Sequence, residues 1–393
     1  MAWAAFGVSL LVLLALAQRN LWLALVSGAL VLGLWTVPPA ALPRVFGKAL
    51  SDPGVLALIY AAGIIPLIGA ALQEGDLLAG LVARLPGGRR VAYVLAPALF
   101  GLLPVPGGAL FSAPILESMG GGKPEERAAA NVWFRHILLL FYPLSAALLT
   151  GAKLAGLDLW TAILWQLPWA FFLLLVGAVF LLSPFSGEKP VGPREGQDGR
   201  RWGWGLGVLF FAPALDLLLR RVAFLPAPEV ATAIGLSAAL LLALGVGPGL
   251  RAFPKLVRRS HPWRFSLIVV GVFLYLGAFQ ASGLPSAMAH LPLPLSLLIL
   301  ALSLLMGLAT GRQQAALSVV IPVYLASGSV LDGWRFSVIY QACYLGYLLS
   351  PLHPCLAVSV EYARARFLGT WRRLLVPSGV ALAGVALAGA FAL

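Results

Sequence analysis

The stretch VAYVLAPALFGLLPVPGGALFSAPILE, residues 91–117, contains two apolar runs separated by a segment that breaks helices. As helices, the runs 91–103 and 109–117 would be about 20 Å and about 13 Å long. The hydrocarbon core of a bilayer is about 30 Å thick, so neither run can cross it. Proline and glycine at Pro104, Pro106, Gly107 and Gly108 interrupt the helix between them. We therefore expect a re-entrant hairpin whose tip lies inside a membrane.

The composition of the whole chain places this stretch in a membrane protein. The 393 residues are 61% hydrophobic and 10% charged, with a mean hydropathy of +0.94, whereas soluble domains carry about 25% charged residues. The net charge of +13 does not indicate nucleic-acid binding, because membrane proteins concentrate Lys and Arg in their cytoplasmic loops. The expected partner is the lipid bilayer.

Ten apolar segments are long enough to be transmembrane spans of an all-α membrane protein. They lie near residues 2–17, 21–37, 53–73, 129–155, 158–183, 205–224, 228–247, 264–283, 335–359 and 378–393. We expect the first segment to be retained as a span rather than removed as a signal peptide, because no basic residue precedes it. The polar stretch 186–202 separates two halves, 1–185 and 203–393, as a linker.

The two halves repeat one another at an offset of 208 residues. Seven glycine or proline pairs coincide without a gap, where chance would give about one or two. The pairs are Gly63 and Gly271, Gly69 and Gly277, Gly75 and Gly283, Pro86 and Pro294, Pro114 and Pro322, Gly120 and Gly328, and Pro143 and Pro351. Each half holds five spans, and an odd number places the second copy upside down in the membrane. This pattern predicts the inverted repeats of secondary transporters.

The second half contains the same interruptions. The runs 295–308 and 314–326 predict a second hairpin with its tip at Ala309–Gln314. Two spans also contain helix breakers near their middle, Tyr142-Pro143 in the fourth and Ser350 to Pro354 in the ninth. Irregular backbone at membrane depth is tolerated only where it is buried in protein or lines a cavity. The two tips and two broken helices should therefore meet at a binding site.

The basic residues indicate an orientation. Alternating the loops between two sides assigns 20 of the 27 Lys and Arg residues to one side and six to the other, with Arg312 left on the second tip. The richer side is cytoplasmic. This places both termini outside the cell, the linker 186–202 in the cytoplasm, and the protein in the plasma (inner) membrane.

The stretch GLLPVPGGALFSAP from Gly101 to Pro114 resembles the signature of an integral-membrane family of unknown function, family 401. Asn131–His136 and Leu349–Pro354 are similar to that family's other landmarks. The family is grouped with the ion transporter superfamily of gluconate, citrate and dicarboxylate carriers. The resemblance implies a homodimer with two hairpins and two broken helices, and sodium coupling in many members.

The tips depart from the better-known carriers, which have Ser-Asn-Thr at both positions. Here they read Pro-Val-Pro-Gly-Gly and Thr-Gly-Arg-Gln-Gln, so the substrate does not follow from the resemblance, and coupling to Na⁺ or H⁺ stays open. No cofactor or metal is expected, since His136, His261, His290 and His353 show no metal-ligand spacing. Cys343 and Cys355 lie about 18 Å apart on a helix, too far for a disulfide.

We predict that the protein is a secondary transporter of a small anionic organic solute. A guanidinium at membrane depth is costly and usually functional, and no carboxylate lies near Arg312 in sequence. The expected binding residues are Pro104, Pro106, Gly107, Gly108 and Ser112 on the first hairpin, Thr310, Gly311, Arg312, Gln313 and Gln314 on the second, and Tyr142, Ser350 and His353 on the broken helices.

Other interpretations remain at this point. Arg312 could reach an aqueous cavity along its long stem, or replace a coupling cation. A channel would need a charged ring or filter sequence, which the chain lacks. An intramembrane enzyme would need catalytic acids, bases or metal ligands. Asp216 is the only carboxylate in the interior of a span, and its position four residues before Arg220 favours an ion pair on a helix surface.

Overall fold

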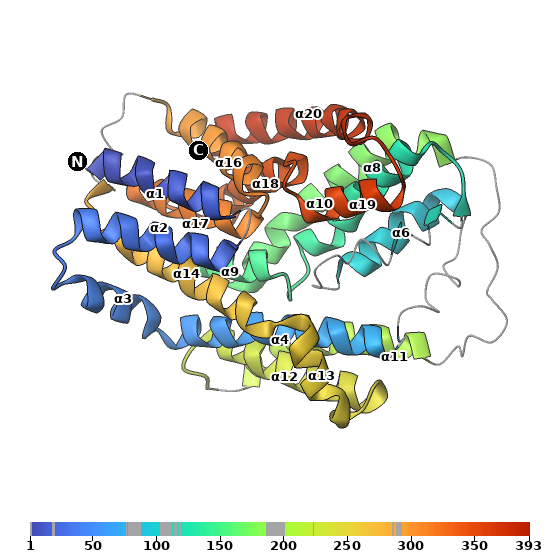
Figure 1. Cartoon of the computed structure of the whole chain (residues 1–393), viewed down its shortest axis with the longest axis horizontal. Helices are drawn as coiled ribbons and strands as arrows, with labels where there is room; N and C mark the ends of the chain where they lie inside the picture. The colour runs from blue at the N-terminus through green and yellow to red at the C-terminus, as the bar shows by residue number, and fades with distance from the viewer. Residues whose placement is uncertain are drawn as a thin grey trace.

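The structure is a computed structural model that describes residues 2–17, 20–75, 77, 88–102, 112–113, 116–117, 119–185, 201–222, 224–284, 287 and 293–393. All regular elements in this part of the chain are helices. By length and composition, six of them can cross a membrane. They are Pro53–Glu74, Leu159–Leu181, Pro228–Val246, Pro262–Ala281, Gly333–Tyr362 (which contains a break) and Phe367–Ala392. Both ends of the chain lie at the same end of the molecule (Figure 1).

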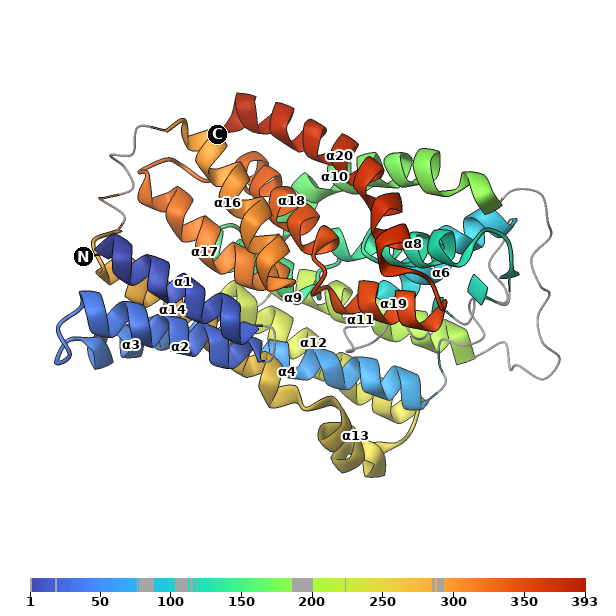
Figure 2. The ribbon, with the colours of Figure 1, turned by 45° about the horizontal axis from the view of Figure 1, so that its top comes forward.

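The helices pack as two groups (Figure 2). The first helix group is α1 (Ala2–Ala17), α2 (Leu21–Thr36), α3 (Leu42–Leu50), α4 (Pro53–Glu74), α11 (Arg201–Val222), α12 (Pro228–Val246), α13 (Phe253–Ser260) and α14 (Pro262–Ala281). Within it α2 packs on α14, α12 packs on α4, and α4 and α14 pack on each other. The sequence did not predict that the third span of each half, α4 or α14, packs with the first and second spans.

The second helix group contains the interrupted helices. It consists of α6 (Arg89–Gly101), α8 (Pro124–Arg135), η1 (Leu138–Leu140), α9 (Ala146–Ala155), α10 (Leu159–Leu181), η2 (Ser183–Phe185), α16 (Leu295–Thr310), α17 (Gln313–Ala326), α18 (Gly333–Leu349), α19 (Pro354–Tyr362) and α20 (Phe367–Ala392). It meets the first group along α4 and α9 and along α14 and α17.

Aspartates fix the starts of three long helices. The carboxylates of Asp52, Asp158 and Asp332 accept hydrogen bonds from backbone amides in the first turns of α4, α10 and α18. Such caps satisfy amides that have no partner within the helix, and each stabilises its helix by about 1 kcal/mol. These short polar residues therefore mark where the apolar segments begin.

Two short helices were not predicted from the sequence. α3 has nine residues and follows α2, and α13 has eight residues, preceded by η3 (Leu250–Ala252), and follows α12. Each buries one large apolar side chain, Leu42 in α3 and Leu256 in α13. They were missed because only one face of each is apolar, so neither resembles a membrane span.

The two broken spans are interrupted at the residues that the sequence indicated. The fourth span is split into α8, η1 and α9, with Tyr142 and Pro143 in the irregular segment before α9. The ninth is split into α18 and α19, with Pro351 in the turn between them. Proline supplies no backbone N–H, so it cannot continue the helical hydrogen bonding at these points.

A helical hairpin is formed by α16 and α17, which have 16 and 14 residues. Their lengths, about 24 Å and about 21 Å, are below the thickness of a bilayer core. The turn is shorter than expected: Gly311 ends α16 with a φ of 59°, and α17 begins at Gln313. In the first half α6 has 13 residues, and Pro104, Pro106, Gly107 and Gly108 lie outside the described residues.

Candidate functional site

The tip of the α16–α17 hairpin contacts the break between α18 and α19. A Cβ added to Gly311 would lie 2.8 Å from Cβ of Leu352, so only glycine fits in this place. The hydroxyl of Ser350 donates to the carbonyl of Leu308 at 2.5 Å and accepts from the amide of Leu352. Ser350 therefore connects the break between α18 and α19 to the last turn of α16 by a hydrogen bond.

Thr310 organises the turn from inside. Its buried hydroxyl donates to the carbonyl of Met306 at 2.7 Å, and the amide of Arg312 lies 3.3 Å from the same oxygen. Gln313 donates from Nε2 to the carbonyl of Tyr340 at 3.3 Å, which holds the start of α17 on α18. Gln314 is half-buried. These contacts make the tip a defined structure rather than a loose loop.

Arg312 is exposed in the structure, which differs from the buried guanidinium that the sequence analysis expected. Its backbone is the N-cap of α17, and the exposed side chain does not carry the full desolvation cost on which that expectation depended. Its charge still acts on Tyr347 and His353. Arg312 thus lies beside the break in the ninth span.

A buried guanidinium near this break belongs to Arg135, the last residue of α8. Arg135 is 4% exposed, and its Nη1 has no hydrogen-bond partner among the described residues. Its charge also acts on His353. Arg135 is one of the 20 basic residues assigned above to the cytoplasmic side, but it is buried at the end of a helix rather than exposed in a loop. Removing it leaves 19 basic residues against six, so the predicted orientation does not change.

Two histidines meet where the broken spans approach each other. His136 follows α8 and His353 precedes α19, and their ring centroids lie 4.9 Å apart. The ring of Tyr347 packs against both, and its hydroxyl lies 3.2 Å from Nε2 of His136. Cys355 offers a free thiol to the same group. We call Arg135, His136, Arg312, Tyr347, His353 and Cys355 the central cluster.

Other predicted site residues have structural partners elsewhere. The buried hydroxyl of Tyr142 donates to the carbonyl of Leu209 at 2.9 Å, which joins the first break to α11. Ser112 donates to Oδ1 of Asn131 at 2.6 Å, and Asn131 donates from Nδ2 to Ser359 at 3.0 Å. Asn131, on α8, therefore links Ser112 to α19.

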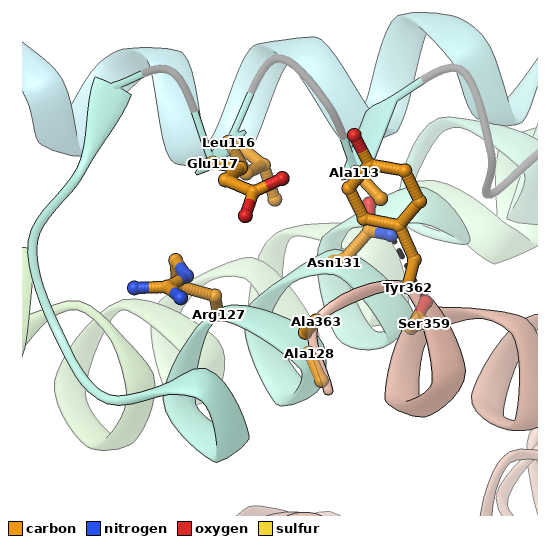
Figure 3. A pocket seen from close by; sticks show the side chains of 9 residues that line it. All are labelled: Ala113, Leu116, Glu117, Arg127, Ala128, Asn131, Ser359, Tyr362 and Ala363. Atoms are coloured by element: carbon orange, nitrogen blue, oxygen red, sulfur yellow. Dashed lines mark hydrogen bonds between the residues drawn. The ribbon is translucent and has the colours of Figure 1, made fainter. Parts of the chain in front are cut away.

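A small cavity lies next to this link (Figure 3). Nine residues line it: Ala113, Leu116, Glu117, Arg127, Ala128, Asn131, Ser359, Tyr362 and Ala363. Figure 3 shows Asn131 bonded to Ser359 on one side and Glu117 with Arg127 on the other. The volume of this cavity is about 240 Å³, counting the part that is open to solvent. This cavity does not include the central cluster.

The predicted ion pair on α11 is present and belongs to a larger network. Nε of Arg220 lies 2.8 Å from Asp216, and its Nη1 lies 2.9 Å from Asp158 at the start of α10. Thr232 and Trp160 also donate to Asp216. Asp216 is therefore fully engaged in structural contacts.

The apolar helices and the broken spans define an all-α, multi-pass membrane protein. A family model described as "Protein of unknown function (DUF401)" matches residues 8–190 and 231–391, so the chain belongs to that family. No curated protein matches the chain. Among solved structures the chain is similar to the YdaH transporter of Alcanivorax borkumensis, with a TM-score of 0.63, 16% identity, and coverage of 94% of this chain and 96% of that chain. At this identity the likeness establishes the fold.

Proposed function

We propose that the protein is a secondary active transporter that carries a small anionic organic solute by alternating access. The observation that carries this proposal is the pair of guanidiniums at the central cluster, Arg135 and Arg312. A buried guanidinium nitrogen without a hydrogen-bond partner is costly, and Nη1 of Arg135 has none among the described residues. A carboxylate-bearing solute would pair with both groups through charge-assisted hydrogen bonds.

The helix termini at this site also favour an anionic solute. α17 begins at Gln313 and α19 at Pro354, and the contact of Gly311 with Leu352 brings these two starts together. The amino end of a helix carries a partial positive charge that favours anions. Broken helices in transporters direct such ends at anionic substrates.

An inverted two-fold arrangement is part of the proposal, and the helix boundaries support it. α9 and α19 begin 208 residues apart, as do α10 and α20. Gly120 and Gly328, also 208 apart, both adopt positive φ. Corresponding helices also pack across the two halves. α2 of the first half packs on α14 of the second, and α12 of the second half packs on α4 of the first. In this arrangement the α16–α17 hairpin and its counterpart at residues 91–117, which begins within α6, are re-entrant, and ten spans cross the membrane.

The two helix groups supply the parts that alternating access needs. We assign the first helix group as the static part, because its long helices run without a break, and the second as the moving part. Homodimerisation through α1, α2, α11 and α12 and coupling to Na⁺ or H⁺ follow the resemblance to the ion transporter superfamily. The surplus of basic residues on one side supports a plasma-membrane protein with both termini outside.

Solute uptake into proteoliposomes tests the transport proposal. Purified protein would be reconstituted and offered labelled mono-, di- and tricarboxylates, with neutral and cationic solutes of similar size as controls. A Na⁺ gradient and a proton gradient would be imposed separately. We expect saturable uptake of at least one carboxylate, driven by one of the gradients. Uptake confined to cationic solutes would contradict the proposal, as would flux that never accumulates solute against its gradient.

A further inference from the structure

Three potential metal ligands converge in the central cluster from distant parts of the sequence. One ligand atom each from His136, His353 and Cys355 lies within 4.8 Å of the others. His136 follows α8, whereas His353 and Cys355 flank the first residue of α19. No local spacing reveals this set, which explains why the sequence analysis expected no metal.

Both imidazoles are oriented as metal ligands are. Nδ1 of His136 lies 2.8 Å from the carbonyl oxygen of Val132, and Nδ1 of His353 lies 3.3 Å from that of Leu348. A carbonyl can only accept, so each Nδ1 carries a proton and, in a neutral ring, each Nε2 presents a lone pair. Metal-binding histidines usually hold their second nitrogen against such an acceptor.

Nε2 of His353 is the feature that the rest of the fold does not explain. His353 is completely buried, and its Nε2 has no hydrogen-bond partner among the described residues. A buried polar atom without a partner costs about 1–3 kcal/mol. Among the described residues, the partner of Nε2 of His136 is the hydroxyl of Tyr347, at 3.2 Å. A bound cation would satisfy His353 and replace the tyrosine at His136.

We propose that His136, His353 and Cys355 form a binding site for a thiophilic divalent cation of the zinc class. Two imidazoles and a thiolate suit such a metal, and three protein ligands leave one coordination position open. Ligands of tetrahedral zinc lie about 3.3–3.8 Å apart, so the cluster must close by about 1 Å. The half-buried Cys355 permits this by a side-chain rotation. The site does not depend on the transport proposal.

Neighbouring charges set the strength of this site. Arg135 and Arg312 both act electrostatically on His353 and repel a cation. Among the described residues, no carboxylate belongs to the group of potential ligands. The cation should therefore bind less tightly than at a closed structural zinc site. Arg312→Gln removes one repelling charge, so we expect this variant to bind Zn²⁺ more tightly than the natural chain.

Binding of Zn²⁺ and Co²⁺ to the purified full-length protein, stripped of metal, tests the proposal without any transport assay. We expect one Zn²⁺ per chain by calorimetry, and a sulfur-to-metal absorption band with Co²⁺. His353→Asn should weaken Zn²⁺ binding at least about tenfold, and Cys355→Ser should abolish the cobalt band. Tyr347→Phe, which frees Nε2 of His136, should strengthen binding.

The matched control is Cys343→Ser. Cys343 is the second free cysteine, and it is fully buried on α18. This variant should keep both the stoichiometry and the cobalt band. Thermal unfolding without metal establishes that each variant is folded, and Zn²⁺ should raise the midpoint only in proteins that retain all three ligands. Absence of stoichiometric Zn²⁺ binding in the natural chain would overturn the proposal. Equal binding by His353→Asn, or loss of the cobalt band in Cys343→Ser, would do the same.

Discussion

Nζ of Lys153 lies 3.3 Å from Oε1 of Glu229, an ion pair that joins α9 of the second helix group to α12 of the first. The same ammonium lies 3.1 Å from Asp52 at the start of α4. The pair of Arg220 with Asp158 likewise joins α11 to α10. If the second group moves during transport, these contacts must break and re-form.

Lys153→Met should destabilise the protein by about 1–3 kcal/mol, because it leaves Glu229 without its cation in a mostly buried position. Oε2 of Glu229 already has no hydrogen-bond partner among the described residues. The double variant Lys153→Met/Glu229→Gln should recover part of the loss. Denaturant unfolding in detergent gives the coupling energy from this cycle. Purely additive losses would show that the two side chains do not stabilise one another.

Asp52 should make the stability pH-dependent. Burial raises the pKa of its carboxyl, but the amide of Val55 and the ammonium of Lys153 together hold the pKa below its usual value of 3.8. A carboxyl with a lowered pKa in the folded state stabilises fully above the unfolded pKa, and this is lost as pH falls through the folded pKa. Asp52→Asn should therefore cost up to about 1 kcal/mol at neutral pH.

Thermal unfolding of both proteins across a pH series checks this. The difference between the natural chain and Asp52→Asn should be constant from neutral pH down to about pH 5 and should shrink below 3.8. A difference that grows on acidification would have the wrong sign for this account.

Ser359→Ala should cost about 1 kcal/mol, since Ser359 accepts the amide of buried Asn131 at 3.0 Å. The matched control is Ser378→Ala, because the buried hydroxyl of Ser378 has no hydrogen-bond partner among the described residues. Its removal should be neutral or slightly stabilising. Equal unfolding free energies for the two variants would exclude a stabilising role for the link between α8 and α19.

Gly311→Ala should be more damaging than an ordinary substitution at positive φ. Gly156 has a similar φ of 66° and nothing within 4 Å of an added Cβ, so Gly156→Ala measures the conformational cost alone, about 1–2 kcal/mol. Gly311→Ala adds a clash with Leu352, worth roughly a further 1–3 kcal/mol. Unfolding of both variants in detergent checks the difference, which should vanish if the tip does not rest on Leu352.

Most of the helical architecture could be predicted because bilayer thickness constrains the sequence. Apolar runs gave the long helices, and proline at Pro143 and Pro351 located the breaks, since a missing N–H acts locally. The helices α3 and α13 were not predicted, because a short helix that is apolar on one face has no continuous run of apolar residues. The packing of α4 on α12 could not be predicted from the sequence, because packing partners are set by tertiary contacts.

The candidate site could be predicted only in outline. Thr310 and Ser350 lie where the hairpin and the break indicated, because their roles follow from local backbone interruptions. The burial of Arg135 and the exposure of Arg312 are opposite to what loop position and depth implied. The convergence of His136 with His353 joins residues 217 positions apart in the chain, and no local pattern carries that information.

The most direct test of the central claim is uptake of the transported anion by Arg135→Gln in proteoliposomes. Arg258→Gln serves as the control, because Arg258 is exposed on α13, outside the central cluster. Thermal unfolding would verify that the variants are folded, and Arg135→Lys keeps the charge if the glutamine does not fold. We predict at least a tenfold loss for Arg135→Gln, a smaller loss for Arg312→Gln, and normal uptake for Arg258→Gln. Normal uptake by folded Arg135→Gln would contradict the account.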